Sequence, residues 1–159
     1  MRKMMRQPST LSLLLLILYT ALSQCQGVVI TEKLLHESAE QFVQRIVENS
    51  DIAVFSKSYC PYCRATKLLL QEHTAQYDGD AREQALLTQT IVELDLMPEN
   101  DGMDVQGALE YMTGQRTVPN VFINSVQMGG NSDMQYLAGT GELAARLRAV
   151  LEMKRDEDL

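Results

Sequence analysis

Cysteine and histidine are scarce in this 159-residue chain, which has three cysteines and two histidines. A small secreted domain held together by disulfides carries more cysteines, usually in even number, so that class is excluded. The chain also lacks an internal repeat and any long polar or Pro/Gly-rich tract, which excludes a disordered second module. Its length and its 45% apolar content suffice for one domain around an ordinary hydrophobic core.

The first 23 residues have the pattern of a secretory signal peptide. Arg2, Lys3 and Arg6 precede an apolar run over residues 11–22, which ends in small residues typical of a cleavage site. The run is shorter than the about 20 residues that a membrane-spanning helix needs. We therefore expect residues 1–23 to be cleaved, with an uncleaved signal anchor as the alternative.

Removal of this segment makes the chain more acidic. Three of the 14 Lys and Arg residues would be lost, leaving 11 against 21 Asp and Glu, a net charge of −10. Such a charge argues against nucleic acid as a partner, and against a membrane unless the segment stays uncleaved. The expected location is the secretory pathway, in the ER or Golgi lumen or outside the cell. The acidic tail at 154–159 faintly resembles a KDEL-type retrieval signal, although a frayed tail is favoured.

Hydrophobic periodicity predicts helices that alternate with short strands. Expected helices cover about residues 35–49, 60–73, 105–112, a segment capped by Asn131 or Ser132, and 143–151; expected strands cover 52–55, 90–96, 118–123 and 125–128. This order predicts an α/β fold with a central four-stranded mixed sheet, parallel at its start and antiparallel in the late hairpin. Pro98 to Gly102 is expected to be a loop. A turn at 77–80 and a short helix over 81–87 are expected in the less regular stretch between.

The segment Cys60-Pro61-Tyr62-Cys63 carries the chemistry, because it follows a strand and opens a helix. Unpaired N–H groups and the macrodipole at a helix start stabilise an anion, so the pKa of Cys60 is expected to fall from about 8.5 to roughly 3.5–7.5. Lys57 adds positive charge nearby. Cys63 lies one turn deeper and is expected to stay a thiol that can attack a mixed disulfide at Cys60.

The two cysteines have two alternative explanations besides a redox pair. A zinc site needs four ligands, and only Cys25, His36 and His73 remain as donors, none at a usual spacing. Two buried structural thiols are the other alternative, which Pro61 and Tyr62 at an exposed helix start disfavour. We therefore expect no metal, and we expect both histidines to face solvent on helices.

Three separated motifs resemble those of the dithiol glutaredoxins, a family with the thioredoxin-like fold. Residues 60–63 resemble the active site, residues 113–123 the second signature, and residues 129–133 the third. The resemblance covers about residues 35–153, within an expected domain at 28–153. It departs from the family at residues 74–89, where this chain looks longer.

The resemblance implies a monomeric glutathione-dependent oxidoreductase that reduces glutathione–protein mixed disulfides through Cys60, with glutathione as co-substrate. It also implies a cis peptide before Pro119, so that the Val118 backbone pairs with the tripeptide. The implied glutathione-binding residues are Lys57, Tyr62, Gln115, Arg116, Thr117, Val118, Pro119, Ser132 and Asp133.

The resemblance divides these residues between the two ends of glutathione. Ser132 and Asp133 would bind the γ-glutamyl end at a helix start. Lys57 would bind the glycine carboxylate together with Gln115 or Arg116. A structural salt bridge for Arg116 and a simple capping role for Asp133 remain as alternatives.

Two other functions stay open at this point. The first is a thioredoxin- or disulfide-isomerase-like enzyme that acts on protein disulfides without glutathione. The second is an iron–sulfur protein, a dimer that shares a cluster through Cys60 and two glutathiones. Pro61 stiffens the loop and disfavours this second function.

Overall fold

The computed structural model describes residues 27–34, 36–75 and 87–157, which contain one mixed sheet. Its strands lie in the order β1 (Gly27–Ile30), β3 (Gln89–Glu93), β2 (Ile52–Ser56), β4 (Asn120–Ile123) and β5 (Val126–Gly129). The first three are parallel and the last two continue the sheet antiparallel. The predicted α/β class and the mixed sheet are confirmed.

The predicted number of four strands is wrong, because β1 adds a fifth at the edge of the sheet. It pairs with β3 from Gly27↔Gln89 to Ile30↔Val92. Val28 and Val29 are exposed and Ile30 is only partly buried. A four-residue edge strand without alternating apolar residues gives no periodic signal in the sequence. Residues 27–30 are a strand only because they pair with β3.

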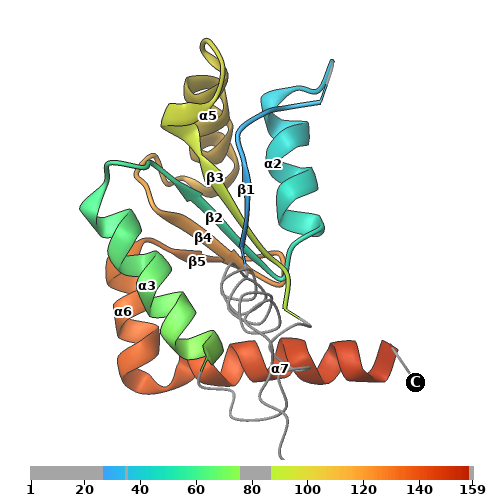
Figure 1. Cartoon of the computed structure of the whole chain (residues 1–159), viewed down its shortest axis with the longest axis vertical. Coiled ribbons are helices and arrows are strands. Elements are labelled where there is room, and N and C mark those ends of the chain that lie inside the picture. Colours follow the sequence, from blue (N-terminus) through green and yellow to red (C-terminus); the bar gives the residue numbers. More distant parts are fainter. Residues whose placement is uncertain (1–26, 35, 76–86, 158–159) are drawn as a thin grey trace, which may run out of the picture.

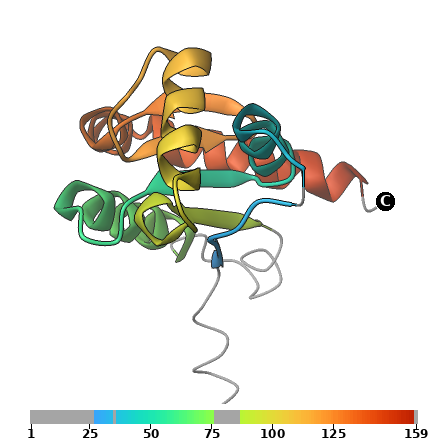
Figure 2. The ribbon, with the colours of Figure 1, turned by 90° about the horizontal axis from the view of Figure 1, so that it is seen from above.

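Helices cover both faces of the sheet (Figures 1 and 2). One face is covered by α2 (Ala39–Glu48) and α5 (Asp101–Thr113), and the other by α3 (Pro61–Ala75), α6 (Asn131–Thr140) and α7 (Glu142–Glu157). Residues of β2 alternate between two cores: Ala53 and Phe55 pack towards α2 and α5, whereas Ile52 and Val54 pack towards α3 and α7. Continuing this alternation, Ser56 lies on the α3 face.

The first helix begins later than the predicted residue 35. Ser38 caps it by accepting a hydrogen bond from the Gln41 N–H, while the Gln41 side chain accepts one from the Ser38 N–H. His36 lies in the preceding turn with a φ of 67°, so its predicted place on a helix is wrong. His73 does lie on α3, but half-buried, with Nδ1 3.0 Å from the Leu69 carbonyl.

The predicted strand at 90–96 ends early, because residues Leu94–Leu96 turn into a short 3₁₀ helix. The predicted loop at 98–102 is also shorter than expected, since α5 begins at Asp101. Gly102 allows this tight packing: a Cβ there would lie 1.9 Å from the Leu94 carbonyl oxygen. Side-chain periodicity carries no information on such a backbone approach.

The late hairpin and the helix after it differ in detail from the prediction. The strand expected over 118–123 begins at Asn120, after the cis peptide between Val118 and Pro119. The next helix is capped by Gly130, not by Asn131 or Ser132, because the Gly130 N–H donates to Asp133 Oδ2 at 2.8 Å.

The last helix runs to Glu157, so most of the segment expected as a tail at 154–159 is helical. Lys154 holds it against the sheet through an ion pair with Asp51 at 2.5 Å. The expected leader, Cys25 and the turn at 77–80 lie outside the described residues and stay predictions. Within the described ranges, no helix has the length and apolar character needed to cross a membrane.

Candidate active site around Cys60 and Cys63

The two cysteines lie where β2 passes into α3. The chain turns after Ser56, and the Cys60 N–H donates to the Lys57 carbonyl at 3.0 Å. The helix begins at Pro61, so Cys60 immediately precedes it. Both thiols are free; Cys60 is partly exposed, whereas Cys63 is fully buried. Only Cys60 therefore presents its sulfur to a reactant.

The helix start lowers the pKa of Cys60, as predicted. Burial by itself raises this pKa, but the N–H groups of Cys63 and Tyr62, the Cys63 thiol and the charge of Lys67 together outweigh burial. The prediction named Lys57 as the nearby cation. The cation identified by the structure is Lys67, on the second turn of α3.

Burial has the opposite result at Cys63. Burial and, to a smaller extent, the neighbouring Cys60 sulfur raise the pKa of this thiol to about 11. The Lys57 N–H and the nearby Ser56 hydroxyl lower it without compensating for burial. Cys63 is therefore a thiol at neutral pH, as expected of a resolving cysteine.

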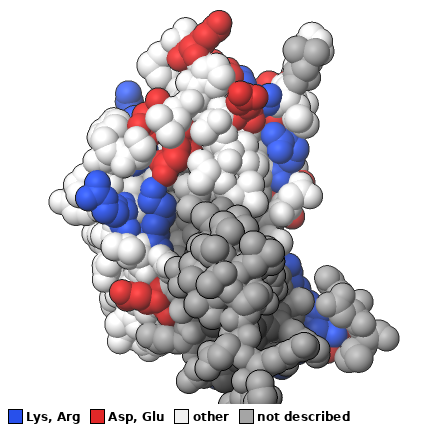
Figure 3. All heavy atoms as spheres, in the orientation of Figure 1, with Lys and Arg blue, Asp and Glu red and all other residues white. Residues whose placement is uncertain are grey.

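Lys67 is held in place by Glu93. Its Nζ lies 2.6 Å from Glu93 Oε1, and both side chains are largely buried, with 23% and 9% of their surface exposed. Figure 3 shows basic side chains gathered over α3, whose lysine and arginine residues are Arg64 and Lys67. The available signal was helical spacing: Lys67 follows Cys63 by four residues and so shares its face.

Asp95 anchors the loop that leads to Cys60. Its carboxylate accepts hydrogen bonds from both the N–H and the hydroxyl of Ser58. Burial raises the pKa of Asp95, but these bonds and the charge of Lys57 lower it overall. Sequence reasoning missed this residue, because 37 positions separate it from Ser58.

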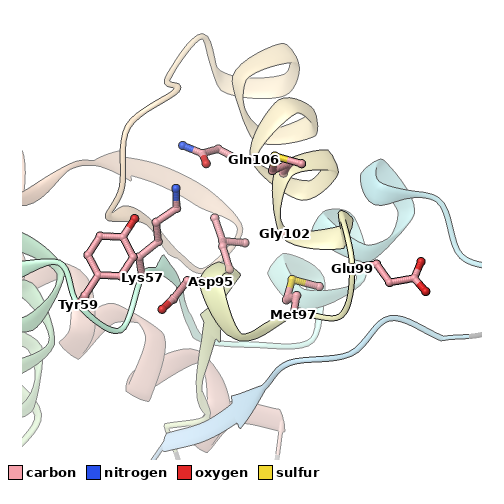
Figure 4. A pocket seen from close by; sticks show the side chains of 9 residues that line it. Lys57, Tyr59, Asp95, Met97, Glu99, Gly102 and Gln106 are labelled. Atoms are coloured by element: carbon pink, nitrogen blue, oxygen red, sulfur yellow. The ribbon is translucent and has the colours of Figure 1, made fainter.

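A pocket of about 200 Å³ opens beside this loop (Figure 4). It is lined by Lys57, Tyr59, Leu94, Asp95, Met97, Glu99, Gly102, Met103 and Gln106. Figure 4 shows the Lys57 ammonium and the Gln106 amide turned towards the same side of the pocket. Lys57 offers a cation to a carboxylate, and Gln106, whose Nε2 already donates to the Arg116 carbonyl at 2.7 Å, retains a second N–H that can donate to it. Gln106 was missed, since no local pattern separates it from other polar residues of its helix.

The cis peptide expected before Pro119 is confirmed. Gln115 fixes this segment, because its Nε2 donates to the Thr117 carbonyl at 3.0 Å and the Pro119 carbonyl at 2.8 Å. Its amide is therefore committed within the protein. Arg116 is exposed and lies 3.9 Å from Glu110, a weak surface pair that leaves its guanidinium available.

The third motif forms the start of α6. Asp133 caps this helix through the Gly130 N–H, which is the structural alternative considered above, while Ser132 is exposed beside it. The Asn131 side chain accepts a hydrogen bond from Thr66 at 3.0 Å, which ties α6 to α3 within a turn of Cys63. Tyr62 is 63% exposed at the start of α3.

The described part of the chain contains no group of three or more His, Cys, Asp or Glu side chains that could hold a metal ion. In this part of the chain, Cys60 and Cys63 therefore do not form part of such a group of metal ligands. What the arrangement can do is thiol–disulfide exchange, with one ionised accessible sulfur and one protonated buried sulfur.

Comparison with known proteins identifies similar chains. The family model described as glutaredoxin matches residues 52–127. Glutaredoxin-C8 of Oryza sativa subsp. japonica is 36% identical over 119 residues, which cover 75% of this chain and 77% of the relative. Glutaredoxin-2 of Schizosaccharomyces pombe is 34% identical over 116 residues, covering 73% of this chain and 93% of the relative.

Solved structures give the same result. Oxidized glutaredoxin 2 from Chlamydomonas reinhardtii superposes with a TM-score of 0.58 at 34% identity, covering 70% of this chain and 92% of the other. A buckwheat glutaredoxin–glutathione complex superposes with a TM-score of 0.57 at 39% identity, covering 70% and 88%.

Proposed function

Because this chain belongs to the glutaredoxin family of glutathione-dependent thiol–disulfide oxidoreductases, we propose that Cys60 is the nucleophile that reduces glutathione–protein mixed disulfides. The observation that carries this assignment is that the two sulfurs differ in exposure and in pKa. Cys60 is accessible and its pKa is lowered, whereas Cys63 is buried with a pKa of about 11. One sulfur attacks and the other resolves.

In the first step the Cys60 thiolate attacks the glutathione sulfur of the mixed disulfide. The Cys60–glutathione bond forms, the original disulfide breaks, and the protein leaves as a thiolate. A second glutathione thiolate then attacks the adduct, which releases glutathione disulfide and regenerates Cys60. In the dithiol branch, Cys63 attacks Cys60 instead, so glutathione leaves and a Cys60–Cys63 disulfide forms.

We propose that glutathione lies between the pocket and the start of α6. Lys57, Gln106 and Arg116 bind the glycine carboxylate, and the Val118 backbone pairs with the extended tripeptide. Ser132 and the free N–H groups of α6 bind the γ-glutamyl carboxylate. The complex of the similar buckwheat glutaredoxin with glutathione supports this ligand.

The protein acts in the secretory pathway, as a monomer. The basic and apolar pattern of residues 1–23 supports this location. Glutaredoxin potentials lie near −200 to −230 mV and the ER pool near −180 to −210 mV, so the Cys60–Cys63 pair would be partly oxidised there. N-terminal sequencing of the protein purified from its native cells tests cleavage of this segment; a start near residue 24 would support a cleaved signal peptide, and a start at Met1 would leave only the uncleaved anchor.

The activity is tested by following deglutathionylation of a glutathionylated peptide in the presence of glutathione. Cys60→Ser is expected to abolish turnover, whereas Cys63→Ser is expected to retain it through the second glutathione. Cys25→Ser is the control for the third thiol and should leave the rate unchanged. Equal loss in the Cys60 and Cys63 variants would refute the proposed division of roles.

A further inference from the structure

The pocket beside Cys60 has an apolar edge that the proposed glutathione contacts leave free. Tyr59 and Met103 line it, from the loop before Cys60 and from α5, and their side chains are 68% and 67% exposed. The same pocket is lined by Leu94 and Met97, which are buried. Tyrosine and methionine are enriched where proteins bind other proteins, and methionine adapts to partners of different shape. Tyr59 and Met103 therefore form an apolar edge suited to a protein partner.

An available carboxylate lies at one end of this pocket. Two carboxylates line the pocket, and one of them, Asp95, is hydrogen-bonded to Ser58. The other, Glu99, is exposed and forms no ion pair within the described part of the chain. Figure 4 shows Glu99 at the end of the pocket opposite to Lys57, with its carboxylate turned outwards. The Glu99 end therefore suits a cation of a partner, whereas the Lys57 end suits an anion.

The position of the apolar edge identifies its occupant. Tyr59 immediately precedes Cys60, so their Cα atoms are about 3.8 Å apart. In the client, the protein that carries the mixed disulfide, residues within three positions of the modified cysteine extend at most about 11 Å from it, so they pass over the surface around Cys60. A second copy of the chain, or any permanent partner on this edge, would cover the reactive sulfur. The fitting occupant is therefore the client, which stays only while the exchange lasts.

We propose that Tyr59 and Met103 bind an apolar side chain of the client, within three residues of its glutathionylated cysteine, and that Glu99 binds a neighbouring lysine or arginine. This inference rests on the proposed function and adds to it a preference among clients. Glutathione is the same in every mixed disulfide, so its binding groups do not distinguish one client from another. The apolar edge and Glu99 supply that distinction.

Reduction of four glutathionylated peptides in the presence of glutathione tests the inference. The peptides share one modified cysteine and differ in the adjacent pair of residues, which is Leu-Lys, Ser-Lys, Leu-Glu or Ser-Glu; one set carries the pair before the cysteine and a second set after it. In at least one set, kcat/KM is expected to be about tenfold higher with Leu than with Ser, because an apolar side chain is buried. It is expected to be about two- to fivefold higher with Lys than with Glu, the range of an exposed ion pair.

Two variants assign these preferences to residues. Met103→Gln should bring the Leu-to-Ser ratio of kcat/KM close to one, and Glu99→Lys should reverse the preference for Lys over Glu, which a general structural change does not do. Met153→Gln on α7 and Glu72→Lys on α3, both at exposed positions, are the matched controls and should keep the wild-type ratios. Ratios within one variant cancel any common effect on folding or on glutathione binding.

The outcomes separate this inference from the proposed function. Equal kcat/KM for the four peptides of both sets would overturn the inference while the activity stands, as would wild-type ratios in the Met103 and Glu99 variants. If the wild-type protein reduces none of the peptides and does not reduce cysteine–glutathione disulfide either, the proposed function fails, and the inference with it.

Discussion

The Ser58 backbone N–H donates a hydrogen bond to Asp95 Oδ1 over 2.8 Å, although 37 positions separate the two residues. The Ser58 hydroxyl donates to the second oxygen of the same carboxylate. Asp95 thereby joins the end of β3 to the loop that leads to Cys60. The start of α3 lowers the pKa of Cys60. The position of Cys60 depends in addition on Asp95, a carboxylate that lies outside this helix.

Asp95→Asn is expected to lower the melting temperature most at neutral pH. The pKa of Asp95 is lowered in the folded state, so its stabilising effect is complete above the unfolded pKa of about 3.9 and is lost as the pH falls through the folded pKa. The difference between wild type and variant should therefore shrink in acid. Melting curves across pH measure this, with the exposed Glu152→Gln as control; a constant difference would contradict it.

Lys67→Gln is expected to raise the pKa of Cys60, because it removes a positive charge that favours the thiolate. Ultraviolet absorbance of the thiolate during a pH titration measures the change, in a Cys63→Ser background that leaves one active-site thiol. Arg148→Gln, an exposed charge on α7, should have no effect. An unchanged Cys60 pKa in the Lys67 variant would show that the helix N–H groups suffice.

Gly102→Ala is expected to destabilise the fold, because the added Cβ would lie 1.9 Å from the Leu94 carbonyl oxygen. Overpacking against backbone typically costs about 1–3 kcal/mol. Gly107→Ala, on the same helix and with no atom within 4 Å of the added Cβ apart from the neighbouring helix backbone, is the matched control and should stabilise by about 0.5–1 kcal/mol. Urea unfolding gives both values. Similar changes in the free energy of unfolding for the two variants would refute the close approach of Gly102 to the Leu94 carbonyl.

Gln106→Ala and Lys57→Ala are each expected to raise the KM for a glutathionylated peptide. Both groups face the pocket, and a hydrogen bond to a charged group contributes about 1.5–3 kcal/mol, or about tenfold or more in affinity. A smaller change is expected in kcat, since neither group touches the reacting sulfur. Gln44→Ala, on α2, is the control. A fall in kcat alone would place both residues outside the binding site.

The sequence was sufficient for features with local causes. The helix start after a buried strand predicted the lowered pKa at Cys60, and hydrophobic periodicity over 105–112 predicted α5, which ends before Gly114 with its φ of 73°. Features with distant causes were missed. Lys67 acts through a fold that places α3 over Glu93, and Asp95 acts through a turn after β3. Spacing along the chain predicts neither the contact of Lys67 with Glu93 nor that of Asp95 with Ser58.

The edge strand β1 would also determine which way the molecule faces if residues 1–23 stayed uncleaved as an anchor. Since β1, β3 and β2 run in the same direction, Gly27 lies at the end of the sheet opposite to Ser56 and the reactive loop. An uncleaved N-terminal anchor would thus attach at the rear of the domain. On that hypothesis Cys60 would point away from the lipid bilayer.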